Sequence, residues 1–494
     1  MNKILTPEEE IYILKRLNYY KSYGINLWAD GEKLKFRSEQ KLSPEMRDEL
    51  MNDKELLLGF FLSETEREAD YFSLTPIQSA YITGCQKDYE LGGTNAHYYV
   101  EYEIEDIDIA CMQKAINRSI CDNDALRLVV CGDGRQRVLK STPEYLLELN
   151  EVTGEEGIMA EREKWSHHIY HLGEWPMFHF GVTKKAGNTY ILHFSFDCII
   201  MDAWSAKMLL DRIFSLYRGE NVSKLDYSFE KYMRQFSANE RCDEKAEKYW
   251  DSRIDDMPEC PVLDYKCNFS DVGEIRYKRL MYRFSAEDTV KLYDRLKKIY
   301  ITPSVFMCTI FLKVMSHYSS KKDITIDLTL FNRMPFDKEV NETLGDFTNI
   351  GFASYHAADE TFMQELQKVS AQFWKLLEFH DYDGTKVLKK LGRRLPGKAL
   401  MPIVFTSTLQ GFVKEQRPLG FREVYAISQT PQTAIDHQLR DDTGALSLSW
   451  DYITELFDEE YINKIFEAYI ALTKKVMFAD NWDQIISTVE GGEG

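Results

Sequence analysis

The chain has 494 residues, of which 44% are hydrophobic and 13% aromatic, a size and composition that predict roughly two to four domains with substantial cores. The net charge is −19, from 80 Asp and Glu against 61 Lys and Arg, and this acidity argues against nucleic acid as the main partner because phosphate neutralisation needs a basic face. No stretch approaches about 20 consecutive apolar residues, so we expect no membrane-spanning helix and no membrane partner.

Residues 1–62 predict a small separate domain. An amphipathic helix with apolar residues at three-residue steps is followed by an alternating segment, "INLWADGEKLKFR", with a type I′ turn signal at Asp30-Gly31. Ser43 and Pro44 are typical of a helix start, and Asn52-Asp53 can divide that helical segment into two helices. The expected order is αββαα, and so small a core is marginal alone, so we expect help from dimerisation or a partner.

This segment resembles the TubC-type N-terminal docking domains of nonribosomal peptide synthetases, on the strength of "GINLWADGEKLKFR" and "LSPEMRDEL…KELLL". The resemblance implies a homodimeric module whose hairpin edge captures the C-terminal tail of the upstream synthetase subunit by strand addition. The candidate docking residues are Trp28, Lys33, Lys35 and Arg37. A purely structural cap is the alternative.

The rest of the chain mixes predicted strands and helices, which indicates an α/β fold. We predict a linker at 63–70, an N-terminal lobe at 71–254, a crossover at 255–270 and a C-terminal lobe at 271–494. The clearest elements are a strand at 95–104, a helix at 108–123, a strand at 188–197 leading into a helix at 203–219, a helix with Thr302 as N-cap and Pro303 at its first position, and a buried strand at 323–333.

Two aspartates, Asp197 and Asp202, lie at the end of the strand at 188–197 in otherwise apolar sequence. A buried, ionised carboxylate must be paired or strongly hydrogen-bonded. The two residues can therefore serve general acid–base catalysis, or each can hold a loop through an arginine. Cys198 has no cationic neighbour in sequence to lower its pKa, which favours an inert core thiol over a nucleophile.

The pattern DxxxxDxxS, formed by Asp197, Asp202 and Ser205, resembles the heterocyclization domains of nonribosomal peptide synthetases. Further matching segments recur in the family's order over about 70–494, namely "LTPIQSAYITG", "LTLFNRMPF", "LGDFTNIG", "PIVFTSTL" and "SQTPQTAIDHQ". The resemblance implies two chloramphenicol-acetyltransferase-like lobes in a V-shaped pseudo-dimer with a central channel. It also implies condensation of a carrier-bound acyl thioester with carrier-bound Cys, Ser or Thr, followed by cyclodehydration to a thiazoline or oxazoline.

The resemblance assigns the catalytic carboxyl group to Asp436 and its partner hydroxyl to Thr406. One carboxyl group that gives and takes protons near neutral pH suits cyclodehydration, and partial burial would raise its pKa toward that range. Ser428 and Gln429 are expected to line the same wall, and Asn332 either holds the intermediate or is structural. A salt-bridged Asp436 and an ordinary strand threonine at 406 are the alternatives.

Asp197 and Asp202 are then interpreted chiefly as structural residues, with Asp202 predicted to pair with Arg333 and tie the lobes together. The sequence departs from the family at 121–127, where "CDNDALR" keeps Arg127 but replaces an Arg-His pair with Asp122-Asn123. Geometry or donor preference near that segment is therefore open.

We expect no metal and no cofactor bound by the domain itself, because substrates arrive on the 4′-phosphopantetheine of donor and acceptor carrier proteins. His167 and His171 have helical spacing without a further ligand, the nine scattered cysteines fit no zinc spacing, and "LGGTN" at 91–95 lacks a carrier serine. Reduced thiols and the lack of a signal-peptide pattern predict a cytoplasmic protein. An amide-forming condensation domain and a catalytically silent docking scaffold are the rival functions, and the choice among Cys, Ser and Thr stays open.

Overall fold

A computed structural model describes residues 5–38, 41–62, 68–239, 244–393, 396–409, 421–442 and 444–486. The chain forms two compact units, each described here by itself. Unit 1 contains Met1–Ser79, Glu101–Glu240 and Arg333–Asp346, and unit 2 contains Ala80–Val100, Arg241–Asn332 and Phe347–Gly494. The domain ranges expected from the sequence stay predictions, and the expected linker lies partly outside the described residues, at 63–67.

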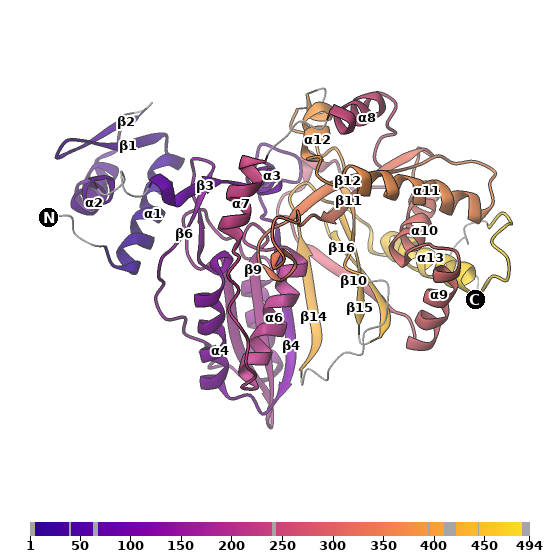
Figure 1. The fold of residues 1–494 in the computed structure, drawn as a ribbon, viewed down its shortest axis with the longest axis horizontal. Helices are drawn as coiled ribbons and strands as arrows, with labels where there is room; N and C mark the ends of the chain where they lie inside the picture. Colours follow the sequence, from indigo (N-terminus) through magenta and orange to yellow (C-terminus); the bar gives the residue numbers. More distant parts are fainter. Residues whose placement is uncertain are drawn as a thin grey trace. The chain divides into compact units, whose positions relative to one another are not determined.

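The N-terminal part of unit 1 has the order αββα within the described residues (Figure 1). Its elements are α1 (Pro7–Ser22), β1 (Ile25–Asp30), β2 (Lys33–Ser38) and α2 (Pro44–Leu62). The hairpin turn consists of Gly31 and Glu32, because Asp30 lies opposite Lys33. Of these two residues Gly31 alone has a positive φ, 58°. The predicted type I′ turn at Asp30-Gly31 is therefore wrong, since that turn needs a positive φ at both central residues.

Helix α2 is continuous through Asn52-Asp53, so the predicted division into two helices is wrong. Asp53 is 4% exposed and its side chain is turned toward α1. Its carboxylate accepts hydrogen bonds from Tyr12 Oη (2.6 Å), Tyr20 Oη (2.7 Å) and Arg16 Nε (2.5 Å). A carboxylate that is fully occupied by a neighbouring helix cannot compete for backbone groups of its own helix, which is how aspartate normally breaks one.

The small N-terminal core continues into the rest of unit 1. Residues of α1, β1 and α2 share one buried cluster with Val129, Cys131 and Leu139. Arg137, only 1% exposed, pairs with Glu10 of α1. Because both charges are withdrawn from water, breaking this pair would leave a costly buried ion. The adjoining segment thus supplies part of the support that so small a core is expected to need.

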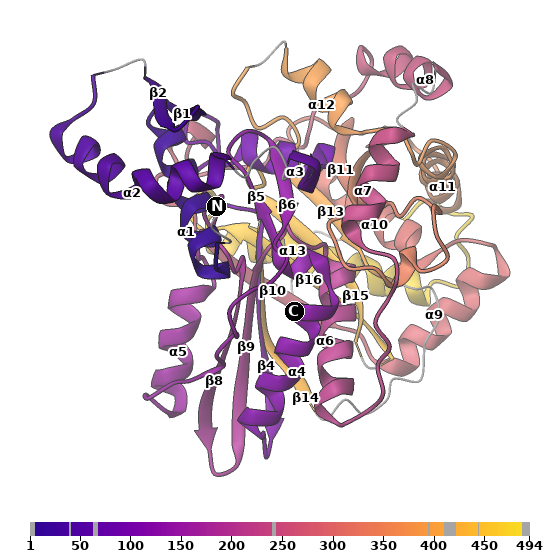
Figure 2. The same ribbon diagram turned by 60° about the vertical axis from the view of Figure 1, so that its left-hand side comes forward.

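The main sheet of unit 1 has the strand order β4-β9-β8-β7, and a smaller sheet has the order β3-β6-β5. Helices α4 and α6 lie side by side against the main sheet in both ribbon views (Figures 1 and 2). The elements that lie wholly or partly in unit 1 are β3 (Tyr71–Ser73), α3 (Pro76–Gly84), β4 (His97–Glu105), α4 (Ile109–Asp122), β5 (Leu128–Val130), β6 (Arg135–Val138), β7 (Glu148–Leu149), α5 (Gly154–Trp165), β8 (Phe178–Ala186), β9 (Thr189–Asp197), α6 (Ala203–Tyr217) and α7 (Phe229–Ala238).

Unit 2 is built on a six-stranded sheet of order β10-β16-β15-β13-β11-β12. Its other elements include a helical layer that contacts this sheet through α9, α10, α11 and α13. The bounds are α8 (Glu244–Ile254), β10 (Tyr277–Arg283), α9 (Ala286–Lys298), α10 (Pro303–Tyr318), β11 (Ile324–Phe331), β12 (Thr348–Tyr355), α11 (Phe362–Glu378), α12 (Thr385–Gly392), β13 (Ile403–Ser407), β14 (Phe421–Gln429), β15 (Ile435–Asp442), β16 (Ala445–Ile453) and α13 (Glu459–Phe478).

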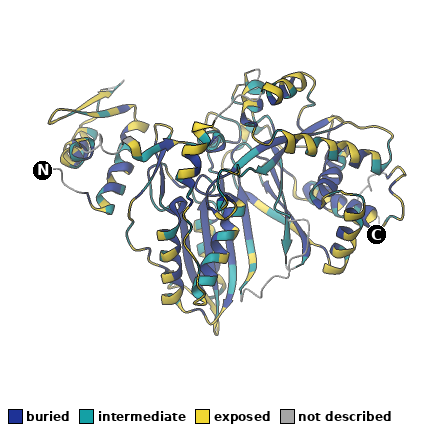
Figure 3. Ribbon diagram, in the orientation of Figure 1, coloured by how far each residue is buried: buried dark blue, intermediate teal, exposed yellow. Residues whose placement is uncertain are grey.

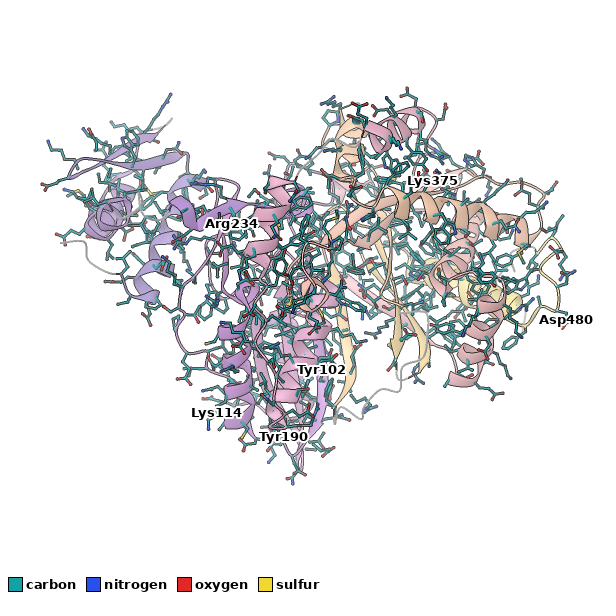
Figure 4. The ribbon with its side chains drawn as sticks, in the orientation of Figure 1. Tyr102, Lys114, Tyr190, Arg234, Lys375 and Asp480 are labelled. Carbon is teal, nitrogen blue, oxygen red and sulfur yellow. The ribbon has the colours of Figure 1, made fainter. Side chains whose placement is uncertain are left out.

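Burial follows these layers. The strands are mostly buried and the outer faces of the helices are exposed (Figure 3). Exposed side chains such as Lys114 of α4 and Lys375 of α11 lie on helix faces turned away from the sheets (Figure 4). The predicted start of α10 is confirmed, because Thr302 accepts a hydrogen bond from Val305 N at 3.3 Å and Pro303 is the first helical residue.

Within the described residues, no single helix has the length and apolar character to cross a membrane. The bent pair α9 and α10, at 101° to each other, meets that criterion only when taken together, on length and composition alone.

Candidate active site

The residues that the sequence marks as catalytic lie on one face of the six-stranded sheet of unit 2. Strands β13 and β15 are parallel, with Val404 opposite Asp436 and Thr406 opposite Gln438. Side chains alternate between the faces of a strand, so Asp436, Gln438 and Thr406 share a face, and Ile435 and His437 lie on the other. His437 is fully buried there against Phe405 and Tyr469, which makes it a core residue.

Thr406 and Asp436 are brought together, as predicted. The Thr406 hydroxyl lies 3.4 Å from Asp436 Oδ1 and 2.8 Å from the Thr329 hydroxyl. A hydroxyl has one proton to donate and can accept as well. Thr406 is the donor in both contacts, so its one proton serves either Thr329 or Asp436, and the three groups form a small cluster on strands β11, β13 and β15.

The Asp436 carboxyl group is 5% exposed. Burial, together with the negative charge of Asp451, raises its pKa from the ordinary 3.8 to about 6. Hydrogen bonds from Gln438 and Ser428 and the positive charge of Arg279 limit that rise. A carboxyl group with a pKa near 6 is present in both protonation states close to neutral pH, which is the requirement for giving and taking protons in one reaction.

An ion pair beside Asp436 was not foreseen from the sequence. Asp451 lies opposite Asp436 on β16, and Arg279 lies opposite Asp451 on β10. The guanidinium contacts Asp451 twice, with Nε–Oδ1 at 2.7 Å and Nη2–Oδ2 at 2.5 Å. Because both side chains are at most 5% exposed, the two-point contact keeps the charges compensated. An isolated aspartate in the apolar strand "ALSLSWDYI" was the signal that could have found it.

Ser428 and Gln429, predicted to line the wall, differ in their surroundings. Ser428 donates its backbone N–H to Asp451 Oδ2 at 3.0 Å, and its side chain hydrogen-bonds the Asp436 carboxyl. Gln429 is 1% exposed, and neither atom of its amide has a hydrogen-bond partner within the described residues. The structure thus joins Ser428 to the Asp436 cluster and leaves the role of Gln429 a prediction.

Asn332 follows the end of β11. Its amide Nδ2 donates to the His380 carbonyl at 2.5 Å, and its backbone N–H donates to Phe347 O at 2.9 Å. These contacts hold the loop that follows α11, which fits the structural alternative. A role in holding the intermediate stays a prediction.

The DxxxxDxxS residues lie in unit 1. Asp202 is the N-cap of α6 and accepts from Ser205 N at 2.6 Å. Arg333 Nη1 donates to Asp202 Oδ2 at 3.0 Å, and Arg333 Nη2 donates to Ser205 Oγ at 2.8 Å. Asp197 accepts from Ile199 N at 2.9 Å and so holds the turn after β9. The predicted Asp202–Arg333 contact is present, and it joins two segments that belong to the same compact unit.

The predicted docking residues share the exposed face of the N-terminal hairpin. Trp28 lies opposite Lys35, and Arg37 and Lys33 occupy alternate positions on the same strand as Lys35. Trp28 is 44% exposed, and the three cations are exposed. An aromatic ring among cations can contact an acidic peptide both through apolar surface and through charge.

No group of three or more His, Cys, Asp or Glu side chains with metal-site geometry occurs among the residues that the structure describes. His167 instead has its Nδ1 2.9 Å from the hydroxyl of Ser166. Cys198 is half-buried.

The fold and the site define a member of the condensation-domain family. The model of the family described as "Condensation domain" matches residues 68–490, so the chain belongs to that family. The model described as "TubC N-terminal docking domain" matches residues 13–63. The expected combination of an N-terminal docking domain and a condensation-superfamily domain is therefore confirmed.

Individual relatives narrow the class further. The chain is 28% identical to bacitracin synthase 1 of Bacillus licheniformis over 87% of its length, and 28% identical to the phenyloxazoline synthase MbtB of a Mycobacterium species over 83%. It spans only 8% and 36% of those two proteins. A solved structure, the EpoB NRPS cyclization-docking bidomain from Sorangium cellulosum, matches 95% of this chain and 99% of its own at a TM-score of 0.78 and 25% identity. These similarities support the predicted class, a heterocyclization-type condensation domain that follows a docking domain.

Proposed function

We propose that this chain condenses a carrier-bound acyl or peptidyl thioester with carrier-bound Cys, Ser or Thr, and then cyclodehydrates the product to a thiazoline or oxazoline. The observation that carries the proposal is the buried Asp436 carboxyl group with its pKa raised to about 6, beside the Thr406 hydroxyl. The ring chemistry that the names of MbtB and the EpoB bidomain indicate for those proteins agrees with it.

The condensation step needs little chemistry from the protein. The acceptor amine attacks the thioester carbonyl, the C–S bond breaks, and the donor thiol leaves with a proton as the amide forms. A thioester is already activated, so holding the two reactants in position supplies most of the rate. We propose that both reactants arrive on 4′-phosphopantetheine arms of partner carrier proteins, and that the domain needs no bound cofactor of its own.

Cyclodehydration requires proton transfer, which is the role proposed for Asp436. The acceptor thiol or hydroxyl adds to the new amide carbonyl and gives a tetrahedral adduct that bears a hydroxyl group. Protonated Asp436 gives its proton to this hydroxyl, the C–O bond breaks and water leaves. The Asp436 carboxylate then takes the proton from the ring nitrogen as the C=N bond forms, which restores the acid. The Thr406 hydroxyl orients Asp436 Oδ1 and stabilises negative charge that develops on the amide oxygen.

The test mixes the protein with a loaded donor carrier and a separately loaded cysteinyl carrier, and the product is weighed intact. A product lighter than the linear amide by one water supports heterocyclization. Linear amide alone would show an amide-forming condensation domain, and no product would show a silent scaffold. Parallel reactions with seryl and threonyl carriers identify the acceptor, for which cysteine is expected because thiols are stronger nucleophiles.

For the docking domain we propose capture of an acidic C-terminal tail from an upstream synthetase subunit on the exposed hairpin face. The charge-reversal variants Lys33→Glu, Lys35→Glu and Arg37→Glu should each weaken binding of such a tail in calorimetry and flatten its salt dependence. Lys54→Glu is the matched control, because Lys54 is an exposed cation on α2 and is not part of the hairpin. Binding that is equally affected by the control and the hairpin variants would contradict capture on this face.

We also propose that the docking domain forms homodimers and that the protein works in the cytoplasm, where cysteine thiols stay reduced. Sedimentation of the wild-type chain tests the first point. A monomer at concentrations well above those of the binding assay would contradict it.

A further inference from the structure

An unbroken chain of contacts links the Arg279–Asp451 ion pair to the Asp436 carboxyl group. Arg279 Nη2 donates to Gln438 Oε1 at 3.2 Å, and Gln438 Nε2 donates to Asp436 Oδ2 at 2.8 Å. Gln438 and Asp436 lie two residues apart on β15, so their side chains are neighbours on one face of the strand. The Thr406 hydroxyl contacts the other oxygen of Asp436, Oδ1.

The chemistry of Arg279 fixes which way the Gln438 amide points. A guanidinium has only donors, so the amide must turn its carbonyl oxygen toward Arg279 and its NH2 group toward Asp436. The opposite orientation would place the Gln438 NH2 group against the N–H groups of Arg279. It would also place the Gln438 carbonyl oxygen against the Asp436 carboxyl group. Arg279 is itself held by two contacts to Asp451, so the amide has no easy alternative.

This fixed amide makes the two oxygens of Asp436 unequal. An amide nitrogen only donates, so Oδ2 must act as an acceptor, whereas the hydroxyls of Thr406 and Ser428 can donate or accept. We propose that Gln438 is a positioning residue that confines the exchangeable proton of Asp436 to Oδ1, the oxygen beside Thr406. The inference rests on the proposed function, in which Asp436 is the group that transfers protons.

Other charged and titratable groups reach Asp436 from the neighbouring strands. Asp451 on β16 raises its pKa and Arg279 on β10 lowers it. In turn, the charge of Asp436 adds to burial in raising the pKa of Tyr277 on β10, and does the same at Asp327 on β11, whose pKa is about 8. None of these groups gives Oδ2 a hydrogen bond among the contacts described, so Gln438 is the residue to change.

The test is an infrared titration of the full-length chain. The carboxylic C=O band of Asp436 is isolated as the difference between a protein and the same protein carrying Asp436→Asn. This is done for the wild type, for Gln438→Met and for Gln438→Glu. The Met variant removes the donor, and the Glu variant keeps an acceptor for Arg279 and so preserves that contact.

Two shifts are expected in both variants. The titration midpoint of Asp436 rises by about one pH unit, a tenfold change in its acid dissociation constant, because a hydrogen bond to the carboxylate is lost. The C=O band also moves to higher frequency, since Oδ2 is the carbonyl oxygen of the protonated acid and no longer accepts the amide hydrogen bond. The ratio of ring to linear product, measured as above, should fall at least tenfold at neutral pH.

Gln372→Met is the matched control. Gln372, on α11, uses both ends of its amide, accepting from Ser354 N and donating to Ser354 O, each at 2.8 Å. Its loss should lower the thermal midpoint of unfolding without moving the Asp436 band. A midpoint and a band that stay at wild-type values in both Gln438 variants would overturn the inference, even if ring formation and its loss in Asp436→Asn are observed. A different outcome is possible, in which the band shifts in the Gln438 variants but the wild type makes only linear amide. That outcome would uphold the proton placement and refute the proposed function.

Discussion

Asp202 and Asp436 are both almost fully buried carboxylates, at 2% and 5% exposed, but they differ in where the nearest arginine is. Arg333 contacts Asp202 directly, with Nη1 3.0 Å from Oδ2. Beside Asp436 the corresponding arginine, Arg279, is bound to the next carboxylate, Asp451. Asp436 receives an amide and two hydroxyl groups instead of a cation.

That difference separates a carboxylate held in an ion pair from one that meets mainly neutral donors. A direct guanidinium partner stabilises the ionised form and makes the pair hard to break. Neutral donors compensate the burial of Asp436 only in part, so its pKa stays at about 6. Arg279 lies on β10, two strands from Asp436 on β15, and is bound to Asp451 on the strand between them. This placement leaves the Asp436 carboxyl group free to exchange its proton. The predictions below test this contrast.

Asp436→Asn should have the largest effect, because it removes the only group assigned to proton transfer. Ring formation should slow by roughly 10²–10⁴-fold, while condensation continues, so that linear amide accumulates in the intact-mass assay. Asp442→Asn is the matched control, since Asp442 ends the same strand and pairs with Arg283 at the surface. Full ring yield from Asp436→Asn would exclude the assignment.

Asp202→Ala should instead lower stability, because it leaves the Arg333 guanidinium buried without its partner. We expect the free energy of unfolding to fall by about 3–5 kcal/mol in denaturant titrations. The variant also removes an N-cap, so the control is Asp108→Ala, which removes the exposed N-cap of α4 and no ion pair. The control should cost about 1 kcal/mol. Equal losses in the two variants would mean that the ion pair with Arg333 adds nothing beyond capping.

The raised pKa of Asp436 also predicts a pH-dependent cost in stability. The folded protein favours the protonated acid, so stability is retained below the ordinary pKa of 3.8 and lost as the pH rises to about 6. Asp436→Asn, which stays neutral, should therefore be more stable than the wild type at pH 7 by up to about 3 kcal/mol. The two proteins should converge below pH 4, and a constant difference across this range would contradict the shifted pKa.

Local patterns in the sequence predicted those features that depend on a few neighbouring residues. Thr302 and Pro303 mark the start of α10 because capping and a fixed φ act within one turn. The pairing of Asp202 with Arg333 could be predicted because a buried carboxylate needs a partner, and the family resemblance supplied the arginine. Thr406 and Asp436 came from the resemblance alone, since nothing in their spacing places them on adjacent strands.

Features that depend on distant contacts were missed. Asn52-Asp53 looks like a helix break, but Asp53 is occupied by Tyr12, Arg16 and Tyr20 from a helix that lies 33 to 41 residues away in sequence. Arg279 and Asp451 are 172 residues apart in the chain. Their pairing follows from the order β10-β16-β15, which only the folded sheet defines.

Thr406→Val should have the smallest effect on the Asp436 site, because it removes one hydroxyl and keeps the shape of the side chain. Ring formation should slow by about tenfold, the cost of one neutral hydrogen bond, since Gln438 still holds Asp436 Oδ2. Thr406→Ser should restore most of the rate. The control is Thr325→Val, which loses a 2.9 Å contact with Ser354 on strands of the same sheet. If Thr406→Val were as damaging as Asp436→Asn, the Thr406 hydroxyl would have to take part in proton transfer itself.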